Sequence, residues 1–365
     1  MSAPRLYIAG MGMITPLGPN VATTVAAVDA GVSAYTLSDY HTDDGEPITM
    51  ARVPDEVFEH TKYEFEEGND VFNHRHGRMI RMAIVALRES VAAVDTLDAT
   101  PLILAVPADQ IQDKGYIPFI PALAHNLKPW IELPLTRRIS TGRAASIEAI
   151  HFAFQYLMDQ PQDYILILGV DSYDDDTVIN QYKNRLLSLS AADSFAPGEG
   201  ACALLLTRHI ELAEQKNGCV IALNPPSMSE EDGHLFSDKP YRGDGLDRAF
   251  KGALTSHPTN SIQSIYSSMN GENHWAKEYG VAYLRNKEKF IEKIKIEHPA
   301  DCYGDLGVAT SAALIIAAAK NLQRTNTTKS LVYSSSDHGL RGALVIEKVL
   351  FRDANKLGEK NDSIG

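Results

Sequence analysis

Short apolar runs alternate with longer amphipathic stretches along this chain, and this alternation limits the fold more than any other feature of the sequence. Residues typical of strands predict strands at 6–9, 102–106, 164–168, 201–206, 220–223, 264–267, 331–333 and 343–346. Helical periodicity predicts helices at 78–91, 144–158, 246–254, 274–294 and 305–322. Strands that alternate with helices favour an α/β fold with a buried sheet.

Two stretches of the chain carry a similar order of strands and helices, on either side of a composition shift near 214–218. In each stretch a helix opens behind a short polar or glycine-containing turn, at Arg143 and at Gly304. We therefore expect two pseudo-repeated halves, 1–215 and 216–350, packed as one structural unit. The polar, acidic segment 41–73 is expected to be a surface excursion, and residues 351–365 a disordered tail.

Charge and hydropathy argue against two classes of partner. The net charge of −13 argues against nucleic acid, because binding to a phosphate backbone needs clustered lysine and arginine. The segment 285–297 mixes both charge signs and is predicted to be a solvated helix face. The longest apolar run, 312–319, is too short to span a bilayer, so no membrane association is expected.

Three cysteines are present, Cys202, Cys219 and Cys302. This odd and sparse number indicates a reducing compartment and no disulfide framework. The opening "MSAPRLYIAGMG" predicts a first strand rather than a secretion signal, because it lacks a long apolar stretch. We expect a cytoplasmic protein in which Cys202 and Cys219 are buried thiols.

The run "ISTGRAASIEAI" (139–150) is typical of a tight turn that feeds an amphipathic helix. An acyl-transfer enzyme would place a cysteine at such a helix start, because backbone N–H groups and the helix dipole lower the pKa of a thiol. This chain has Arg143 there, and a guanidinium stays protonated and cannot attack a thioester. The site is built for chemistry that its residue cannot perform.

The charge of Arg143 opposes the helix dipole, so a nearby carboxylate should compensate it. The candidates are Glu148, Glu199 and Glu272. We favour an internal ion pair that fills the pocket. The alternative is an anchor for a carboxylate, a phosphate or an acidic side chain of a partner.

The remaining polar clusters favour structural roles over metal or cofactor binding. The acidic residues are Asp171, Asp174, Asp175 and Asp176. They have no histidine or cysteine at ligand spacing, and we expect a solvated or interface loop. The histidines at 74 and 76 lack a third ligand. "GMG" (10–12) and "GEG" (198–200) are expected to be scaffold turns, because neither has the lysine or the spacing of a phosphate loop.

Seven segments resemble the β-ketoacyl synthases, the condensing enzymes of the thiolase-like superfamily. "LYIAGMGMITPLG" (6–18) is similar to their opening, and "ISTGRAASIEAIHFAF" (139–154) to their nucleophile turn and helix. "YILILGVDSY" (164–173) and "APGEGACALLL" (196–206) resemble the strand, acidic turn and Gly-Glu-Gly turn that follow. "YSSMNGENHWAKEYG" (266–280) and "YGDLGVATSAALIIAAA" (303–319) resemble the two histidine regions, and "SSSDHGLRGALVIEK" (334–348) the closing loop. The order is collinear over roughly residues 5–350.

The resemblance implies a five-layered αβαβα fold with two pseudo-repeated halves, usually in a dimer. It also implies a cysteine that holds an acyl chain and two histidines that stabilise the enolate formed by malonyl decarboxylation. In this chain the cysteine position is Arg143, and the histidine positions are Asn270 and Gly304. The family lysine falls on Pro299, and the gating phenylalanine falls on Asp337. The resemblance therefore implies a pseudoenzyme with no catalytic residue and no cofactor.

Three of these positions are candidate binding residues: Arg143, Asn270 and Asp337. Asn270 can donate a hydrogen bond to a ligand carbonyl, although we favour a turn residue before Gly271. Gly304 is expected to serve the backbone geometry just before a helix that starts at Asp305.

Three functions are consistent with this pattern. The leading one is a catalytically inactive ketosynthase-like protein with an accessory, adaptor or chaperone-like role, as occurs beside bacterial secretion systems such as type VI. The second is a chain-length-factor-like subunit that pairs with an active ketosynthase in fatty acid, polyketide or aryl-polyene synthesis. The third is an acyltransferase with a relocated nucleophile, Cys302, beside His274, His298 or His338. The implied partners are a second ketosynthase-fold chain, identical or different, and a protein cargo or an acyl carrier protein.

Overall fold

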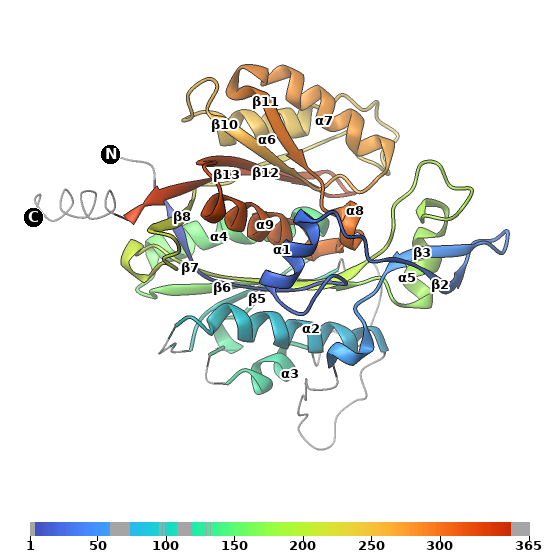
Figure 1. Ribbon diagram of the computed structural model, residues 1–365, viewed down its shortest axis with the longest axis horizontal. Coiled ribbons are helices and arrows are strands. Elements are labelled where there is room, and N and C mark those ends of the chain that lie inside the picture. The colour runs from blue at the N-terminus through green and yellow to red at the C-terminus, as the bar shows by residue number, and fades with distance from the viewer. Residues whose placement is uncertain are drawn as a thin grey trace, which may run out of the picture.

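A computed structural model describes residues 4–58, 74–94, 97, 99–107, 119–128, 130–131 and 133–351 of the protein. Five layers are stacked in it, as Figure 1 shows. Helices α2 (His74–Val91) and α3 (Phe119–Asn126) cover one outer face, and α6 (Asp244–Leu254) and α7 (Asn273–Arg285) cover the other. Helices α4 (Ala145–Asp159) and α9 (Thr310–Arg324) lie between the two sheet layers. The predicted five-layered αβαβα arrangement is confirmed.

Ten strands form one continuous path of hydrogen-bonded neighbours. In the first half they are β1 (Leu6–Ile14), β4 (Leu102–Ala105), β5 (Arg137–Ile139), β6 (Tyr164–Ser172) and β7 (Glu199–Thr207). In the second half they are β8 (Cys219–Leu223), β10 (Ile262–Ser267), β11 (Phe290–Glu297), β12 (Lys329–Ser335) and β13 (Leu340–Leu350). A short strand, β9 (Ser227–Glu230), pairs with β13, and β2 (Tyr35–His41) and β3 (Pro47–Ala51) form a separate hairpin.

The two halves repeat one topology. The strand order is β5-β4-β6-β7-β1 in the first half and β11-β10-β12-β13-β8 in the second. In each half the first two neighbour pairs are parallel and the last two are antiparallel. Strands β1 and β8 join the halves through an antiparallel pair that includes Leu6 and Leu223. The division of the chain at residue 215 stays a prediction.

The inner helices meet at their N-termini, and this contact positions the site. Each follows a 3-10 turn, Gly142–Ala144 before α4 and Gly307–Ala309 before α9. Both turns begin with a glycine of positive φ, +79° at Gly142 and +54° at Gly307. The Ser146 N–H of α4 donates to Ser311 Oγ of α9 at 3.2 Å. The second of the two equivalent turns is therefore at Gly307, and the sequence-based assignment to Gly304 was wrong.

The "GMG" segment lies inside strand β1 and is not a turn, contrary to the sequence-based expectation. It lets helix α2 approach the strand closely. A Cβ atom at Gly12 would lie 1.8 Å from the carbonyl oxygen of Ala86, and one at Gly10 would lie 1.9 Å from that of Ser90. Any side chain at these two positions would push the helix off the sheet.

The eight predicted strands all overlap observed strands, and the predicted helices at 78–91, 144–158 and 246–254 are confirmed to within a few residues. The prediction of one helix over 274–294 was wrong, because α7 ends at Arg285 and β11 begins at Phe290. The supposed solvated helix face at 285–297 is mostly this strand, which pairs in parallel with β10. Strand β11 is an edge strand of the sheet, and alternating charged residues are typical of edge strands.

Several elements had no strong sequence signal. Helix α3 was not predicted, and neither were α1 (Val21–Asp29), α5 (Asp176–Tyr182) and α8 (Ala300–Tyr303). The segment 41–58 is not a simple surface excursion, because Ile48, Met50 and Phe58 are buried in it. The rest of that segment, 59–73, and residues 352–365 of the predicted tail lie outside the described residues.

Cys202 and Cys219 are free and buried, as predicted, and Cys302 is free and half-buried. Within the described residues no helix has the length and apolar character needed to cross a bilayer.

Gly12→Ala should lower the free energy of unfolding by about 2–4 kcal/mol, because its Cβ would collide with the backbone of α2. Gly280→Ala is the matched control, because Gly280 lies inside helix α7 with open space at its Cβ position. The control should raise the free energy of unfolding by about 0.5–1 kcal/mol. Urea unfolding followed by circular dichroism measures both, and equal effects would contradict the close approach of α2 to β1.

Candidate functional site

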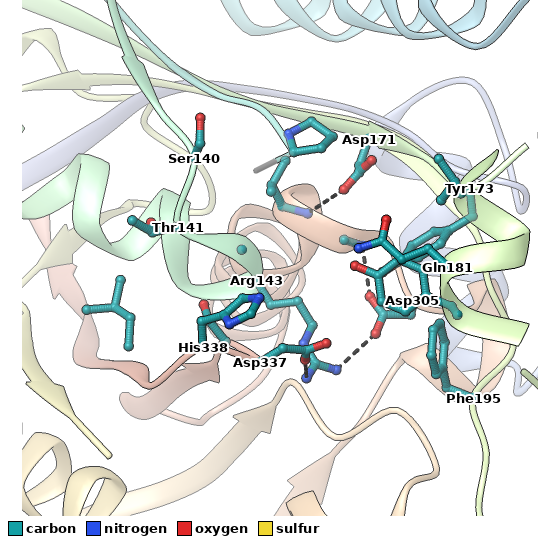
Figure 2. A pocket seen from close by; sticks show the side chains of 18 of the residues that line it. Ser140, Thr141, Arg143, Asp171, Tyr173, Gln181, Phe195, Asp305, Asp337 and His338 are labelled. Atoms are coloured by element: carbon teal, nitrogen blue, oxygen red, sulfur yellow. Dashed lines mark hydrogen bonds and ion pairs between the residues drawn. The ribbon is translucent and has the colours of Figure 1, made fainter. Parts of the chain in front are cut away.

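A cavity of about 550 Å³ lies where the two inner helices begin, and residues of both halves line it (Figure 2). The first half supplies Arg143 and Arg185, and the second half supplies Asp305 and Asp337. Aromatic rings of Tyr173, Tyr182, Phe195 and Phe236 form much of the remaining wall. Among the described residues its lining includes no cysteine and one histidine, His338.

Arg143 stands in the 3-10 turn before helix α4 and is only 5% exposed. Its Nη1 donates to Asp305 Oδ2 at 2.9 Å, and its Nη2 donates to Asp337 Oδ1 at 2.7 Å. Its Nε donates to the carbonyl oxygen of Ser335 at 3.1 Å. The guanidinium also lies 4.2 Å from the ring centroid of Trp275, a cation–π distance. Each guanidinium nitrogen therefore has a partner inside the protein.

The chain of ion pairs continues beyond Arg143. Asp337 Oδ2 accepts from Arg185 Nη1 at 2.8 Å. Arg185 then holds Glu272 with two hydrogen bonds, from Nε at 2.7 Å and from Nη2 at 2.9 Å. Asn270 Nδ2 donates to Glu272 Oε2 at 3.1 Å and to Asp305 Oδ2 at 2.8 Å, which closes the network into a ring. We call these six residues the arginine–carboxylate ring: Arg143, Arg185, Asn270, Glu272, Asp305 and Asp337.

Burial and pairing act in opposite directions on the titration of the ring. Burial opposes the charge of Arg143, but Asp337 and Asp305 raise its pKa above the ordinary value. Burial raises the pKa of Asp337, and Arg143 and Arg185 more than offset this, so the pKa lies below its usual value. Burial also raises the pKa of Glu272. Its hydrogen bonds to Arg185 and the charge of Arg185 more than offset this, so the pKa of Glu272 lies below its usual value. Arg143, Asp337 and Glu272 are therefore charged near neutral pH.

The expected internal ion pair of Arg143 is present, but its hydrogen-bonded partners differ from the expected ones. Glu148 accepts from Thr141 Oγ1 at 2.5 Å. Glu199 binds Arg78 in a separate buried cluster. Glu272 raises the pKa of Arg143 from a distance and is hydrogen-bonded to Arg185 instead. The compensating carboxylates come from the second half, where tertiary contact and not sequence proximity places them.

The structure brings Asn270 and Asp337 into contact with this ring and leaves Gly304 outside it. Asn270 is 5% exposed, and its side chain bonds within the protein. Gly304 ends helix α8 with φ of +78°, where a Cβ would lie 3.0 Å from the carbonyl oxygen of Ala196. The helix expected at Asp305 begins only at Thr310, and Asp305 Oδ1 instead accepts from the Gly307 N–H at 2.8 Å.

The prediction of a solvated acidic loop at 171–176 was wrong for its first two aspartates. Asp171 is 6% exposed and pairs with Arg75 Nη2 at 3.0 Å. Asp174 is also 6% exposed, and its Oδ2 accepts from Arg52 Nε at 2.6 Å. Asp175 caps helix α5 by accepting from two backbone N–H groups. Strand β6 carries Asp171 into the interior, and Asp174 follows the end of that strand.

The histidines at 74 and 76 lie in the first turn of helix α2, not in a strand or loop. His74 Nε2 lies 3.1 Å from Asp174 Oδ2. Among the described residues, no group of three histidine, cysteine or carboxylate side chains is arranged to hold a metal ion.

No cysteine of this chain is set up as a nucleophile. Burial raises the pKa of the Cys202 thiol above its ordinary value. Burial, with Asp301 and Glu297, also raises the pKa of the Cys302 thiol. A raised thiol pKa lowers the thiolate fraction that nucleophilic attack requires.

Sequence reasoning missed Arg185, Trp275 and the role of Asp305. No local pattern marks them, because each acts through a partner far away in the chain. Arg185 follows helix α5 in a 3-10 turn and reaches Glu272 and Asp337 across the cavity. Trp275 lies on α7, and its Nε1 donates to Glu272 Oε2 at 2.9 Å.

No protein-family model matches the chain, and no curated protein matches it either. Solved structures do match. A ketosynthase/chain length factor of ishigamide gives a TM-score of 0.73 at 18% identity, with 95% of this chain and 99% of that chain covered. This chain has the thiolase-like fold of the ketosynthases.

Further matches agree with this assignment of the fold. The ketosynthase from module 6 of the bacillaene synthase of Bacillus subtilis 168 gives a TM-score of 0.73 at 16% identity, over 94% of this chain and 72% of that chain. A ketosynthase in complex with its chain length factor from Xenorhabdus doucetiae gives a TM-score of 0.69 at 16% identity, over 95% of this chain and 98% of that chain. The fold is thus shared while most residues differ.

Arg143→Met should lower the free energy of unfolding by about 3–5 kcal/mol, because it leaves the buried carboxylates of Asp305 and Asp337 without their shared cation. Urea unfolding at pH 7 measures the loss. Arg324→Met is the control, because Arg324 and Asp29 form an ion pair with side chains 45% and 51% exposed. The control should lower the free energy of unfolding by less than about 1 kcal/mol. An equally small loss for Arg143→Met would contradict the claim that the arginine–carboxylate ring stabilises the fold.

Asp171→Asn should change the pH dependence of stability. Burial raises the pKa of Asp171 to about 6, despite the pairing with Arg75. Between about pH 4 and pH 6 the folded chain holds a proton that the unfolded chain has released. The stabilisation is therefore complete below about pH 4 and is lost as the pH rises through about 6, an effect on the order of 1–3 kcal/mol.

The measurement is the free energy of unfolding of both proteins from pH 4 to pH 7. The free energy of unfolding of the wild type should fall relative to that of Asp171→Asn as the pH rises over this interval. The reason is that Asp171 loses its proton in this range, whereas asparagine does not titrate. A difference that stays constant with pH would contradict the raised pKa of Asp171.

Proposed function

We propose that this chain is a catalytically inactive ketosynthase-like protein that works by binding another protein. The observation that carries the proposal is the arginine–carboxylate ring. It occupies the start of helix α4, the place where the sequence resemblance puts the nucleophilic cysteine. The guanidinium of Arg143 is held there by internal contacts and offers no nucleophilic atom.

The surroundings of Arg143 support the same conclusion. The described part of the cavity lining contains no thiol and one histidine, His338, whose ring is tilted against that of Phe236 with centroids 5.0 Å apart. Enolate stabilisation in a condensing enzyme needs donors aimed at the developing oxyanion. Asn270 is the one amide at the family's histidine positions, and its Nδ2 is already bonded to Asp305 and Glu272.

The proposed partner is a second ketosynthase-fold chain. Several of the matching structures are named as pairs of a ketosynthase and a chain length factor. Strand β5 ends the sheet of the first half, and within the described part of the chain no further strand pairs with its outer edge. An edge of this kind can accept a strand from another subunit. The partner is an identical chain or a different one, and the accessory role requires only that the pair forms.

A chain-length-factor-like subunit is the second candidate. It is favoured by the matches to ketosynthase–chain length factor pairs and by the cavity that remains beside Arg143. The first candidate, an adaptor or chaperone-like protein such as those beside secretion systems, is favoured by the polar network that fills the catalytic position. Both roles place the protein in the cytoplasm, and an acyl carrier protein is a further partner only in the second role. The relocated nucleophile has the least support, because the pKa of Cys302 is raised.

One experiment tests the proposal in two arms. The purified protein and its Arg143→Cys variant are incubated with a malonyl-loaded acyl carrier protein, and released carbon dioxide is measured. Neither should decarboxylate the malonyl group, because Asn270 and Gly304 do not replace the two histidines. Activity of the wild-type chain would overturn the claim of inactivity.

In the second arm the chain is co-expressed with ketosynthases of its own organism and studied by size-exclusion chromatography with light scattering. The expected mass is that of two ketosynthase-fold chains, either two copies of this chain or one copy with a ketosynthase. A strictly monomeric chain in every combination would overturn the pairing.

A further inference from the structure

The wall of the cavity at the start of helix α4 contains more carboxylates than cations. The arginines in its described lining are already paired: Arg75 with Asp171 at 3.0 Å, and the other two inside the arginine–carboxylate ring. Glu148 and Glu230 line the same cavity. Among the described residues, no lysine, arginine or histidine forms an ion pair with either of them. The described wall therefore has an excess of negative charge.

The two carboxylates are close enough to influence each other. Burial raises the pKa of the Glu230 carboxyl, Arg341 lowers it, and the charge of Glu148 raises it again, so the pKa lies above its usual value. Arg341 is already paired with Glu278 at 2.5 Å. Glu148 accepts a hydrogen bond from the Thr141 hydroxyl at 2.5 Å, which leaves its charge in place. A cation between Glu148 and Glu230 would be attracted by both.

The aromatic part of the wall already surrounds one positive charge. The Cζ atom of Arg185 lies 5.6 Å from the ring centroid of Tyr182, 5.4 Å from that of Phe195 and 5.5 Å from that of Phe236. Aromatic faces attract cations at such distances through the quadrupole of the ring. These three rings therefore form a wall that suits a positively charged group.

Glu230 lies beside the loop that carries His338. A Cβ atom at Gly339 would lie 2.8 Å from Glu230 Oε2, and Leu340 pairs with Glu230 between strands β13 and β9. Phe236 is 53% exposed, and its ring is tilted against that of His338 with centroids 5.0 Å apart. A carboxylate and an open aromatic surface therefore line the cavity together.

We propose that this cavity binds an organic cation, namely a primary ammonium group on a short apolar chain. The ammonium group donates to the carboxylates of Glu148 and Glu230, and the chain packs against Phe236 and His338. The volume of about 550 Å³ lies within the usual range of small-molecule sites. A free aliphatic amine and the lysine side chain of a partner protein both present this chemistry.

The same wall disfavours anions and metal ions. An anion could reach Arg143 only by displacing Asp305 or Asp337, which already bind its guanidinium at 2.9 and 2.7 Å. It would then face Glu148 and Glu230 in a wall of its own charge. Within the described part of the chain, no three potential ligand side chains are arranged to hold a metal ion.

The inference goes beyond the proposed function, because neither catalytic inactivity nor pairing with another chain requires a ligand in the cavity. Its failure would leave the decarboxylation assay and the mass measurement unchanged, so the two proposals fail separately.

Isothermal titration calorimetry of the wild-type chain with hexylammonium and with hexanoate tests the sign of the preferred charge. These probes share one alkyl chain and do not depend on how any variant folds. Hexylammonium should bind saturably and more tightly than hexanoate, and added salt should weaken its binding. Equal or tighter binding of hexanoate, or no saturable binding of hexylammonium, would overturn the proposal.

A third titration distinguishes the two sources of the ammonium group. Nα-acetyl-lysine methylamide carries the lysine side chain without backbone charges. Tighter binding of this probe than of hexylammonium supports a lysine of a partner protein as the natural ligand, and weaker binding supports a free amine.

Two variants locate the site. Glu148→Gln and Glu230→Gln should each weaken hexylammonium binding about fivefold, because each removes one charge from a partly exposed pair and keeps the size of the side chain. Glu211→Gln is the matched control, because its side chain is 66% exposed beside His209 and outside the cavity lining, and no change is expected. Unchanged affinity in both cavity variants would overturn the assignment of the site.

Discussion

The buried ion pairs of Arg143 join the two pseudo-repeated halves at the start of helix α4. Arg143 and Arg185 come from the first half, and Glu272, Asp305 and Asp337 come from the second. Removing one member of such a buried network leaves an uncompensated charge, which costs far more than the loss of a surface pair. The ring therefore lines the cavity and fastens the interface between the halves at the same time.

The same arrangement explains how a buried arginine is held at the start of helix α4. Helix α4 still begins behind a glycine of positive φ, and helix α9 begins behind an equivalent one. This backbone frame supports a thiolate when a cysteine stands at the turn, because the helix dipole favours a negative charge there. With an arginine in that place the dipole opposes the charge, and Asp305 and Asp337 compensate it.

Close approach of the backbone at three glycines sets how the layers pack elsewhere in the molecule. Gly10 and Gly12 allow α2 to lie directly on β1, and Gly169 fits where a Cβ would be 2.9 Å from both Ser146 Oγ and the carbonyl oxygen of Val308. These glycines lie at the contacts between layers. The five layers can stack only because the strands present no side chain at those points.

The sequence by itself determined the α/β class, the cores of eight strands, three helices and the turn that leads from Arg143 into helix α4, because periodicity and a turn–helix signal are local properties. It also predicted that Arg143 would need an internal carboxylate. Only the tertiary structure decided which carboxylates those are, because Asp305 and Asp337 lie 162 and 194 positions away along the chain. The same reason explains the errors at 171–176 and 285–297: whether an acidic turn is buried, or a charged amphipathic segment is helix or edge strand, depends on which distant segment packs or pairs with it.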